Sequence, residues 1–277
     1  MPLTEFQIEV ASLLVCNRTP ESHLAGGAAL HLLPNSNRYS NDLDFFHDSV
    51  ERVAEAYLAD SAVLFKHGFE IVVAMTQPGY VRASVSRVGL STQLEWAHDS
   101  AWRFMPPIQH PAVGYQLHPI DLAVNKVLTL AGRDEARDFL DVLFVHSEIL
   151  PLGALVWAAV GKDPGFSPFS LLELLRRRGK YRSEDFARLH LKQEVNLQET
   201  KSTWLSALQD SSEFISRREP DQSGCLYYSV SEGRFVAPDS SAESLPDGVL
   251  PHFGRPGGVL PTFFQGDALA ELARSAW

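Results

Sequence analysis

Residues 23–46 read HLAGGAALHLLPNSNRYSNDLDFF, and this stretch decides the fold. It places Gly26 and Gly27 where a short strand leads into a short helix. A glycine pair at such a point lets backbone N–H groups approach a phosphate closely. The stretch then runs into Asp42-Leu43-Asp44, and residues i and i+2 of a strand point to the same face. Together the two parts predict a place for magnesium and a triphosphate.

Each part of this stretch also has a plainer interpretation. Aspartate is common at turns, so Asp42 and Asp44 can simply end a solvated strand. The glycine pair can serve only a tight turn. Ser40 precedes Asp42 by two residues and points the same way as the carboxylates, which makes it either a phosphate contact or an ordinary turn serine. The combination of the glycine pair with the aspartate pair favours the metal-and-phosphate interpretation.

Composition excludes several classes of protein. A chain of 277 residues is long enough for one large domain or two modest ones. The net charge of −10 argues against non-specific coating of nucleic acid but leaves a local basic patch possible. No run of eighteen apolar residues occurs, so we expect no membrane span. The start of the chain lacks signal-peptide features, and Cys16 and Cys225 suggest no disulfide framework, so we expect a cytoplasmic protein.

Hydrophobic periodicity outlines the elements. Helical spacing covers residues 3–17, and strands are expected at 23–25, 42–46, 70–76, 80–87 and 92–97. Ser49 is expected to cap a helix that Gly68 closes, with an apolar stripe of Val53, Tyr57, Leu58 and Leu64. Helices then dominate to about residue 215, including 121–131 and 134–145. Residues 221–262 form either a small β-rich appendage or an irregular tail.

Two further groups of charged residues are candidates for chemistry. Glu95 lies between Leu94 and Trp96, so it is either a third carboxylate of the metal site or a residue that faces water. Asp138 and Asp141 share one helix face, and Lys126 lies on the preceding helix. The lysine can hold a triphosphate while an aspartate orients it or accepts a proton, or the three can form an inter-helix salt bridge.

The third candidate feature is a basic segment. Residues 176–192 carry seven Lys or Arg against two acidic residues. Such a patch suits RNA phosphates, with Tyr181 available for stacking, or it is a solvated helix end. The candidate RNA contacts are Arg176, Arg177, Arg178, Lys180 and Arg182.

With these groups in place, the chain resembles the AbiEii/AbiGii-type toxin nucleotidyltransferases of the DNA polymerase β-like superfamily. Four motifs carry the resemblance in the family's order, namely residues 24–30, 38–46, 122–126 and 136–141. Four ordered motifs are far more specific than any single one. Two departures from the pattern are visible. The spacing from Gly27 to Asp42 is slightly long, and nothing beyond about residue 220 matches.

The resemblance implies an α+β fold in three segments. A polymerase β-like nucleotidyltransferase core, a small mixed sheet with flanking helices, would occupy residues 1–117. A helical domain that completes the active site would occupy 118–218, and a Pro/Gly-rich C-terminal appendage of unassigned role would occupy 219–277. The implied activity is magnesium-dependent transfer of a nucleoside monophosphate from an NTP, with two Mg²⁺ ions. The implied setting is a toxin–antitoxin or phage-defence system, with the 3′ end of tRNA as acceptor and a protein antitoxin as partner.

Carried over by position, the resemblance gives each candidate a role. Asp42 and Asp44 would bind metal, Gly26, Gly27 and Ser40 would cradle the triphosphate, and Lys126 would contact a phosphate. Asp138 or Asp141 would be an essential acid. Two other interpretations stay open: transfer to a small hydroxylated molecule or to a protein hydroxyl, and an inactive nucleotide-binding module of the same fold.

Overall fold

The computed structural model describes residues 3–239 and 244–261. By internal contacts the chain divides into two units that interleave along the sequence. The first unit comprises Met1–Leu122, Tyr181–Leu197 and Arg255–Gly258, and the second comprises Ala123–Lys180, Gln198–Gly254 and Val259–Trp277. The division into 1–117, 118–218 and 219–277 expected from the sequence stays a prediction.

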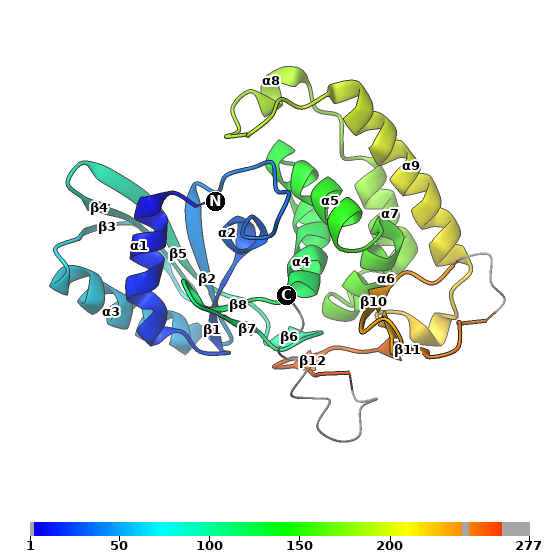
Figure 1. The fold of residues 1–277 in the computed structure, drawn as a ribbon, viewed down its shortest axis with the longest axis horizontal. Helices are drawn as coiled ribbons and strands as arrows, with labels where there is room; N and C mark the ends of the chain where they lie inside the picture. The colour runs from blue at the N-terminus through cyan, green and yellow to red at the C-terminus, as the bar shows by residue number, and fades with distance from the viewer. Residues whose placement is uncertain (1–2, 240–243, 262–277) are drawn as a thin grey trace. The chain divides into compact units, whose positions relative to one another are not determined.

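The first unit is built on a mixed seven-stranded sheet with the strand order β3-β4-β5-β2-β1-β8-β7 (Figure 1). Strands β2 and β5 run parallel, as do β1 and β8, and the other neighbours run antiparallel. The strands are β1 (Ser22–Ala25), β2 (Asp42–His47), β3 (Glu70–Gln77), β4 (Tyr80–Arg87), β5 (Leu90–His98), β7 (Ile108–His110) and β8 (Gly114–Gln116). Strand β6 (Trp102–Arg103) pairs separately with β12 (Arg255–Pro256).

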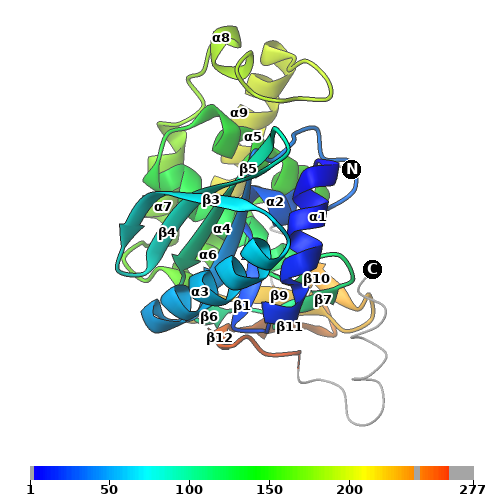
Figure 2. The same cartoon turned by 90° about the vertical axis from the view of Figure 1, so that its left-hand side faces the viewer.

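Side chains alternate between two faces of this sheet. On the apolar face Leu43 and Phe45 of β2 are fully buried, and β4 and β5 add Val81, Ala83, Val85, Leu94 and Trp96. Helices α1 (Glu5–Leu14) and α3 (Val50–Lys66) cover this face (Figure 2). The polar face carries the alternate residues, among them Asp42, Asp44, Glu95, Tyr80 and Arg82, all partly exposed. The alternation expected from the sequence is confirmed.

Capping residues set the two covering helices. The Thr4 hydroxyl accepts from the backbone N–H of Gln7, the Gln7 side-chain oxygen accepts from the backbone N–H of Thr4, and this capping box starts α1. The Ser49 side chain accepts from the backbone of Arg52 at the start of α3, as expected. The predicted apolar stripe of α3 is wrong at one position, because Leu58 is 67% exposed whereas Val53 is buried. Periodicity alone does not show how far a sheet extends beneath a helix.

The second unit is mostly helical. Its helices are α4 (Pro119–Gly132), which begins in the first unit, α5 (Ala136–Glu148), α6 (Leu152–Lys162), α7 (Pro168–Arg176) and α9 (Leu197–Ser216), whereas α8 (Ser183–Phe186) belongs to the first unit. The segment after α9 forms a three-stranded sheet, β10-β9-β11, from Arg234–Val236, Leu226–Ser229 and Val249–His252. Of the two expectations for this segment, the β-rich one fits its described residues.

No single helix in the described residues has the length and apolar composition needed to cross a membrane. Helices α5 and α6 meet those criteria only as a pair, with a bend of 113° between them.

Candidate metal centre and phosphate-binding loop

Strand β2 places two carboxylates side by side. Asp42 and Asp44 project from the polar face, while Leu43 between them is fully buried on the apolar face. The buried neighbour fixes the register, because a slip of one residue would bury both aspartates. The Ser40 hydroxyl donates to the Asp42 side chain, Oγ to Oδ1, over 3.0 Å, which holds that carboxylate.

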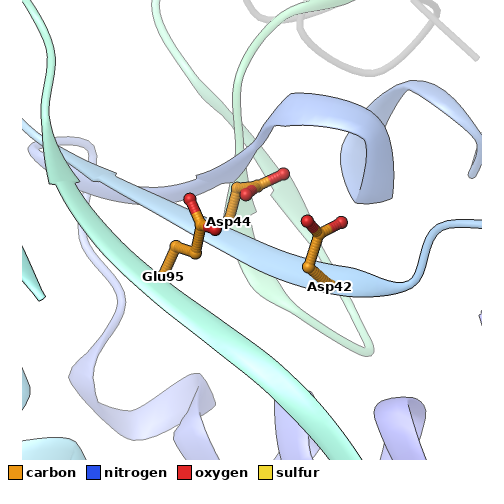
Figure 3. Close-up of side chains that lie close together, drawn as sticks. All are labelled: Asp42, Asp44 and Glu95. Atoms are coloured by element: carbon orange, nitrogen blue, oxygen red, sulfur yellow. The ribbon is translucent and has the colours of Figure 1, made fainter. Parts of the chain in front are cut away.

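Strand β5 adds the third carboxylate. Glu95 pairs with Asp44 across the parallel β2–β5 ladder. One oxygen from each of Asp42, Asp44 and Glu95 lies within 4.8 Å of the other two, and Figure 3 shows the three side chains converging. Glu95 therefore joins the aspartates, with its side chain only 16% exposed. Three carboxylates in partial contact with water are the hard oxygen ligands that Mg²⁺ prefers, so the donor set fits this ion.

Two residues of β4, Tyr80 and Arg82, lie next to Glu95 on the side away from β2. The Arg82 guanidinium donates from Nε to Glu95 Oε1 over 2.8 Å, and its Nη2 lies 2.7 Å from the same oxygen. Burial and the nearby Glu95 carboxylate raise the pKa of Tyr80 to about 12. The phenol therefore stays protonated at neutral pH. Sequence reasoning did not single out Arg82, because its pairing depends on the register between β4 and β5.

The glycine pair opens α2 (Gly26–Leu30) directly beside the carboxylates. Gly26 has a φ of +61°, and a Cβ there would lie 1.9 Å from Asp44 Oδ2. A Cβ on Gly27 would lie 3.0 Å from Arg38 Nη2 and 3.2 Å from Ser40 Oγ. Only glycine leaves this space free, and a guanidinium and a hydroxyl line it. These are the groups that bind phosphate oxygens.

The structure adds residues around this space that the sequence interpretation left without a role. Arg38 is buried, and it forms an isolated antiparallel β-bridge with Leu191. Lys192 donates from Nζ to the Ser36 carbonyl over 2.6 Å, which ties the segment after α8 to this loop. Alternation was the available signal, because Arg38, Ser40, Asp42 and Asp44 are spaced by two.

In the second unit, α4 and α5 bring together the lysine and both aspartates. Lys126 Nζ lies 2.7 Å from Asp141 Oδ2 and 3.9 Å from Asp138 Oδ1, and all three side chains are at least nine-tenths buried. Arg133 Nε donates to Asp138 Oδ2 over 2.7 Å. Lys126 and Asp141 thus form the inter-helix salt bridge that was one of the two interpretations. The role of these residues in phosphate binding or proton transfer stays a prediction.

The basic segment after α7 is partly engaged within the protein. Arg178 donates to the Ala131 carbonyl and faces Asp134 at 3.4 Å, and Arg176 pairs with Glu173 at 3.0 Å. Exposed positions are Arg176, Arg177, Lys180 and Arg182. The expectation that Tyr181 is available for stacking is wrong, because Tyr181 is buried. Its ring packs against that of Phe186, with the ring centroids 5.8 Å apart.

Comparison with known proteins supports the fold. No model of a protein family matches the chain, and no curated protein matches its sequence. Among solved structures, the chain is similar to MenT4, a nucleotidyltransferase toxin from Mycobacterium tuberculosis. The identity is 20%, the match covers 78% of this chain and 83% of that chain, and the TM-score is 0.53.

A second similar structure is JHP933 from Helicobacter pylori, at 18% identity over 77% of this chain and 95% of that chain, with a TM-score of 0.47. The likeness to MenT4 shows that this chain has the nucleotidyltransferase fold, and the expected α+β fold class is confirmed.

Proposed function

We propose that this chain is a magnesium-dependent nucleotidyltransferase that moves a nucleoside monophosphate from an NTP to an acceptor hydroxyl. The observation that carries the proposal is the convergence of Asp42, Asp44 and Glu95 within 4.8 Å beside the glycine pair. A transferase of this kind needs charge neutralisation and alignment more than covalent chemistry from the protein.

In the proposed reaction the acceptor oxygen attacks the α-phosphorus in line. The new oxygen–phosphorus bond forms as the bond to the bridging oxygen of pyrophosphate breaks, and pyrophosphate leaves. Asp42, Asp44 and Glu95 would hold two Mg²⁺ ions. Bound Mg²⁺ supplies neutralisation of the triphosphate charge and lowers the pKa of the attacking hydroxyl.

The remaining residues would bind and orient the triphosphate. Gly26 and Gly27 leave room for phosphate oxygens, and the Ser40 hydroxyl lies 3.2 Å from the Cβ position over Gly27. For the second unit we keep the roles given by the motif resemblance. Lys126 contacts a phosphate, and Asp138 and Asp141 orient that lysine or accept the acceptor's proton. The ion pairs of Lys126 with Asp138 and Asp141 are compatible with this orienting role.

The acceptor we propose is an RNA, the 3′ end of tRNA, with the chain acting in the cytoplasm as a toxin that a protein antitoxin restrains. Support comes from the exposed cations of the basic segment, Arg176, Arg177, Lys180 and Arg182, in a chain of net charge −10. Arg178 contributes less, since its guanidinium already binds the Ala131 carbonyl.

A labelling experiment tests this function. Purified protein is incubated with Mg²⁺, total tRNA and each of the four α-³²P-labelled NTPs in turn. We expect one or more NTPs to label the tRNA, and Asp42→Asn to abolish labelling without unfolding the protein. Absence of transfer from all four NTPs, or full activity of Asp42→Asn, would contradict the RNA transferase.

A second acceptor class has one observation in its favour. The strongly acidic chain attracts cations, and two arginines of the basic segment are paired internally, which favours a cationic, hydroxylated small molecule. The same assay with an aminoglycoside in place of tRNA distinguishes the two. Labelled aminoglycoside with unlabelled tRNA supports the small molecule, and NTP binding without any transfer supports an inactive module.

A further inference from the structure

Arg82 lies in one row with the proposed metal ligands. Glu95 pairs with Asp44 on its β2 side and with Arg82 on its β4 side, so the three residues occupy matching positions on three neighbouring strands. Their charges run negative, negative, positive along the polar face. A cation at this position is unexpected beside a proposed metal site, because it repels the metal and attracts the ligand.

The contacts show how strongly Arg82 holds Glu95. Both Nε and Nη2 of the guanidinium approach Glu95 Oε1, at 2.8 Å and 2.7 Å. The Glu95 side chain is 16% exposed, and that of Arg82 is 38% exposed. The Arg82 guanidinium also lies 5.6 Å from the centre of the Tyr80 ring. A partly buried, charge-assisted contact of this kind competes with metal coordination at the same carboxylate.

We propose that Arg82 is a built-in counter-cation that competes with divalent metal for Glu95 and thereby lowers the metal affinity of the nucleotide-free protein. The inference rests on the proposed function, because it takes Asp42, Asp44 and Glu95 as the metal ligands. A triphosphate is strongly anionic, so its arrival offsets the Arg82 charge and favours metal loading. Arg82 thus couples full metal loading to the presence of the nucleotide.

The alternative role for Arg82 predicts the opposite sign. If the guanidinium only positions Glu95 for the metal, its removal loosens the ligand and weakens metal binding. If it competes, its removal strengthens metal binding. The direction of the change therefore separates the two roles.

The test is a Mn²⁺ titration of the full chain without nucleotide, with free Mn²⁺ measured by electron paramagnetic resonance. We expect Arg82→Gln to bind Mn²⁺ roughly three- to tenfold more tightly than the wild type. Adding a non-hydrolysable NTP should tighten Mn²⁺ binding more in the wild type than in Arg82→Gln. Arg82→Met, which keeps the aliphatic stem, repeats the measurement if the glutamine variant is poorly folded.

Arg87→Gln is the matched control. Arg87 lies on the same strand and pairs with Glu9 at 2.5 Å, away from the three carboxylates. Its substitution removes the same charge and should leave Mn²⁺ affinity unchanged. Thermal unfolding of each variant confirms that the fold is retained.

Asp42→Asn separates failure of the inference from failure of the proposed function. If the wild type binds Mn²⁺ and Asp42→Asn does not, the metal site stands, and unchanged or weaker binding by Arg82→Gln overturns the counter-cation alone. If the folded wild type binds no Mn²⁺ with or without an NTP, both the inference and the proposed function are overturned.

Discussion

The two faces of the seven-stranded sheet differ in how their carboxylates are paired. On the apolar face, Asp60 of α3 is fully buried and accepts from Arg18 at 2.5 Å and from Trp96 Nε1 at 2.7 Å. On the polar face, Asp42, Asp44 and Glu95 converge within 4.8 Å, and Arg82 is the cation that contacts the group at Glu95. The covered face neutralises its carboxylate with protein donors, whereas the polar face gathers like charges.

This difference separates stability from function on the same strands. A buried carboxylate needs donors, and removing them leaves an uncompensated charge. Converging carboxylates repel one another, and a fold retains such repulsion where a ligand relieves it. We therefore expect substitutions on the apolar face to change the free energy of unfolding and substitutions on the polar face to change activity.

The largest effect is expected on the polar face. Asp44→Asn should lower nucleotidyl transfer by about 10³-fold, because it removes a charge that holds the metal in the transition state. The free energy of unfolding should change little, since the substitution also removes repulsion within the cluster. Single-turnover kinetics and urea unfolding measure the two quantities.

Glu21→Gln is the control for loss of a carboxylate. Glu21 pairs with Arg52 on the surface of the same unit, and its side chain is 52% exposed. It should keep full activity. An Asp44→Asn variant with a lowered free energy of unfolding and an unchanged specific activity would contradict this assignment of stability to one face and activity to the other.

Asp60→Asn should give the next largest effect, on stability. It leaves the Arg18 guanidinium buried without its carboxylate, at a cost of about 3–5 kcal/mol. Urea unfolding measures the loss, and Glu21→Gln again serves as the exposed reference, with about 0–1 kcal/mol expected. A loss for Asp60→Asn as small as that of the control would mean that the apolar face does not depend on this pair.

Gly26→Ala tests whether the glycine loop keeps space free for the Asp44 carboxylate on the polar face. The new Cβ would lie 1.9 Å from Asp44 Oδ2, so the carboxylate has to move, and Mn²⁺ affinity should fall about tenfold. Gly68→Ala is a close control, because Gly68 also has a positive φ, +77°, but a Cβ there meets nothing within 4 Å. Both variants should lose about 1–2 kcal/mol of stability from backbone strain. Equal Mn²⁺ affinities would show that Gly26 serves only the turn.

Local patterns in the sequence were enough to predict five of the seven strands of the sheet, β1 to β5, and the grouping of the first two carboxylates, whereas the short strands β7 and β8 were missed. Period-two alternation placed Asp42 and Asp44 opposite Leu43, and Ser49 and Gly68 bounded α3 as expected. Such features depend on a few neighbouring residues. The resemblance to the toxin nucleotidyltransferases gave the fold class, which no single motif determined.

Features that depend on distant contacts could not be predicted. The β2–β5 register brings Glu95 beside Asp44, and the β4–β5 register brings Arg82 beside Glu95. The Tyr181 ring packs against Phe186 of α8, and Leu58 of α3 is exposed although periodicity places it in the apolar stripe. The burial of both side chains depends on how the helices pack, which hydrophobic periodicity alone does not show.

The smallest expected effect concerns pH and the apolar face. His47 follows Leu43 and Phe45 in the alternation, is fully buried, and neither of its ring nitrogens has a hydrogen-bond partner in the described residues. Burial, and then the charges of Arg18 and Arg52, lower its pKa from 6.5 to about 3. Between these values the unfolded chain binds a proton that the native protein does not, so stability is lost as pH falls below 6.5.

His47→Leu should remove this dependence. Between about pH 7.5 and about pH 5.5, the wild type should lose about 1.4 kcal/mol that the leucine variant keeps, because leucine binds no proton when the chain unfolds. Urea unfolding at the two pH values measures the difference. His67→Gln removes an exposed histidine of the same unit and should follow the wild type. If His47→Leu also follows the wild type, the native protein protonates His47 in this range, and the apolar face admits a charge that burial and the charge of Arg18 should exclude.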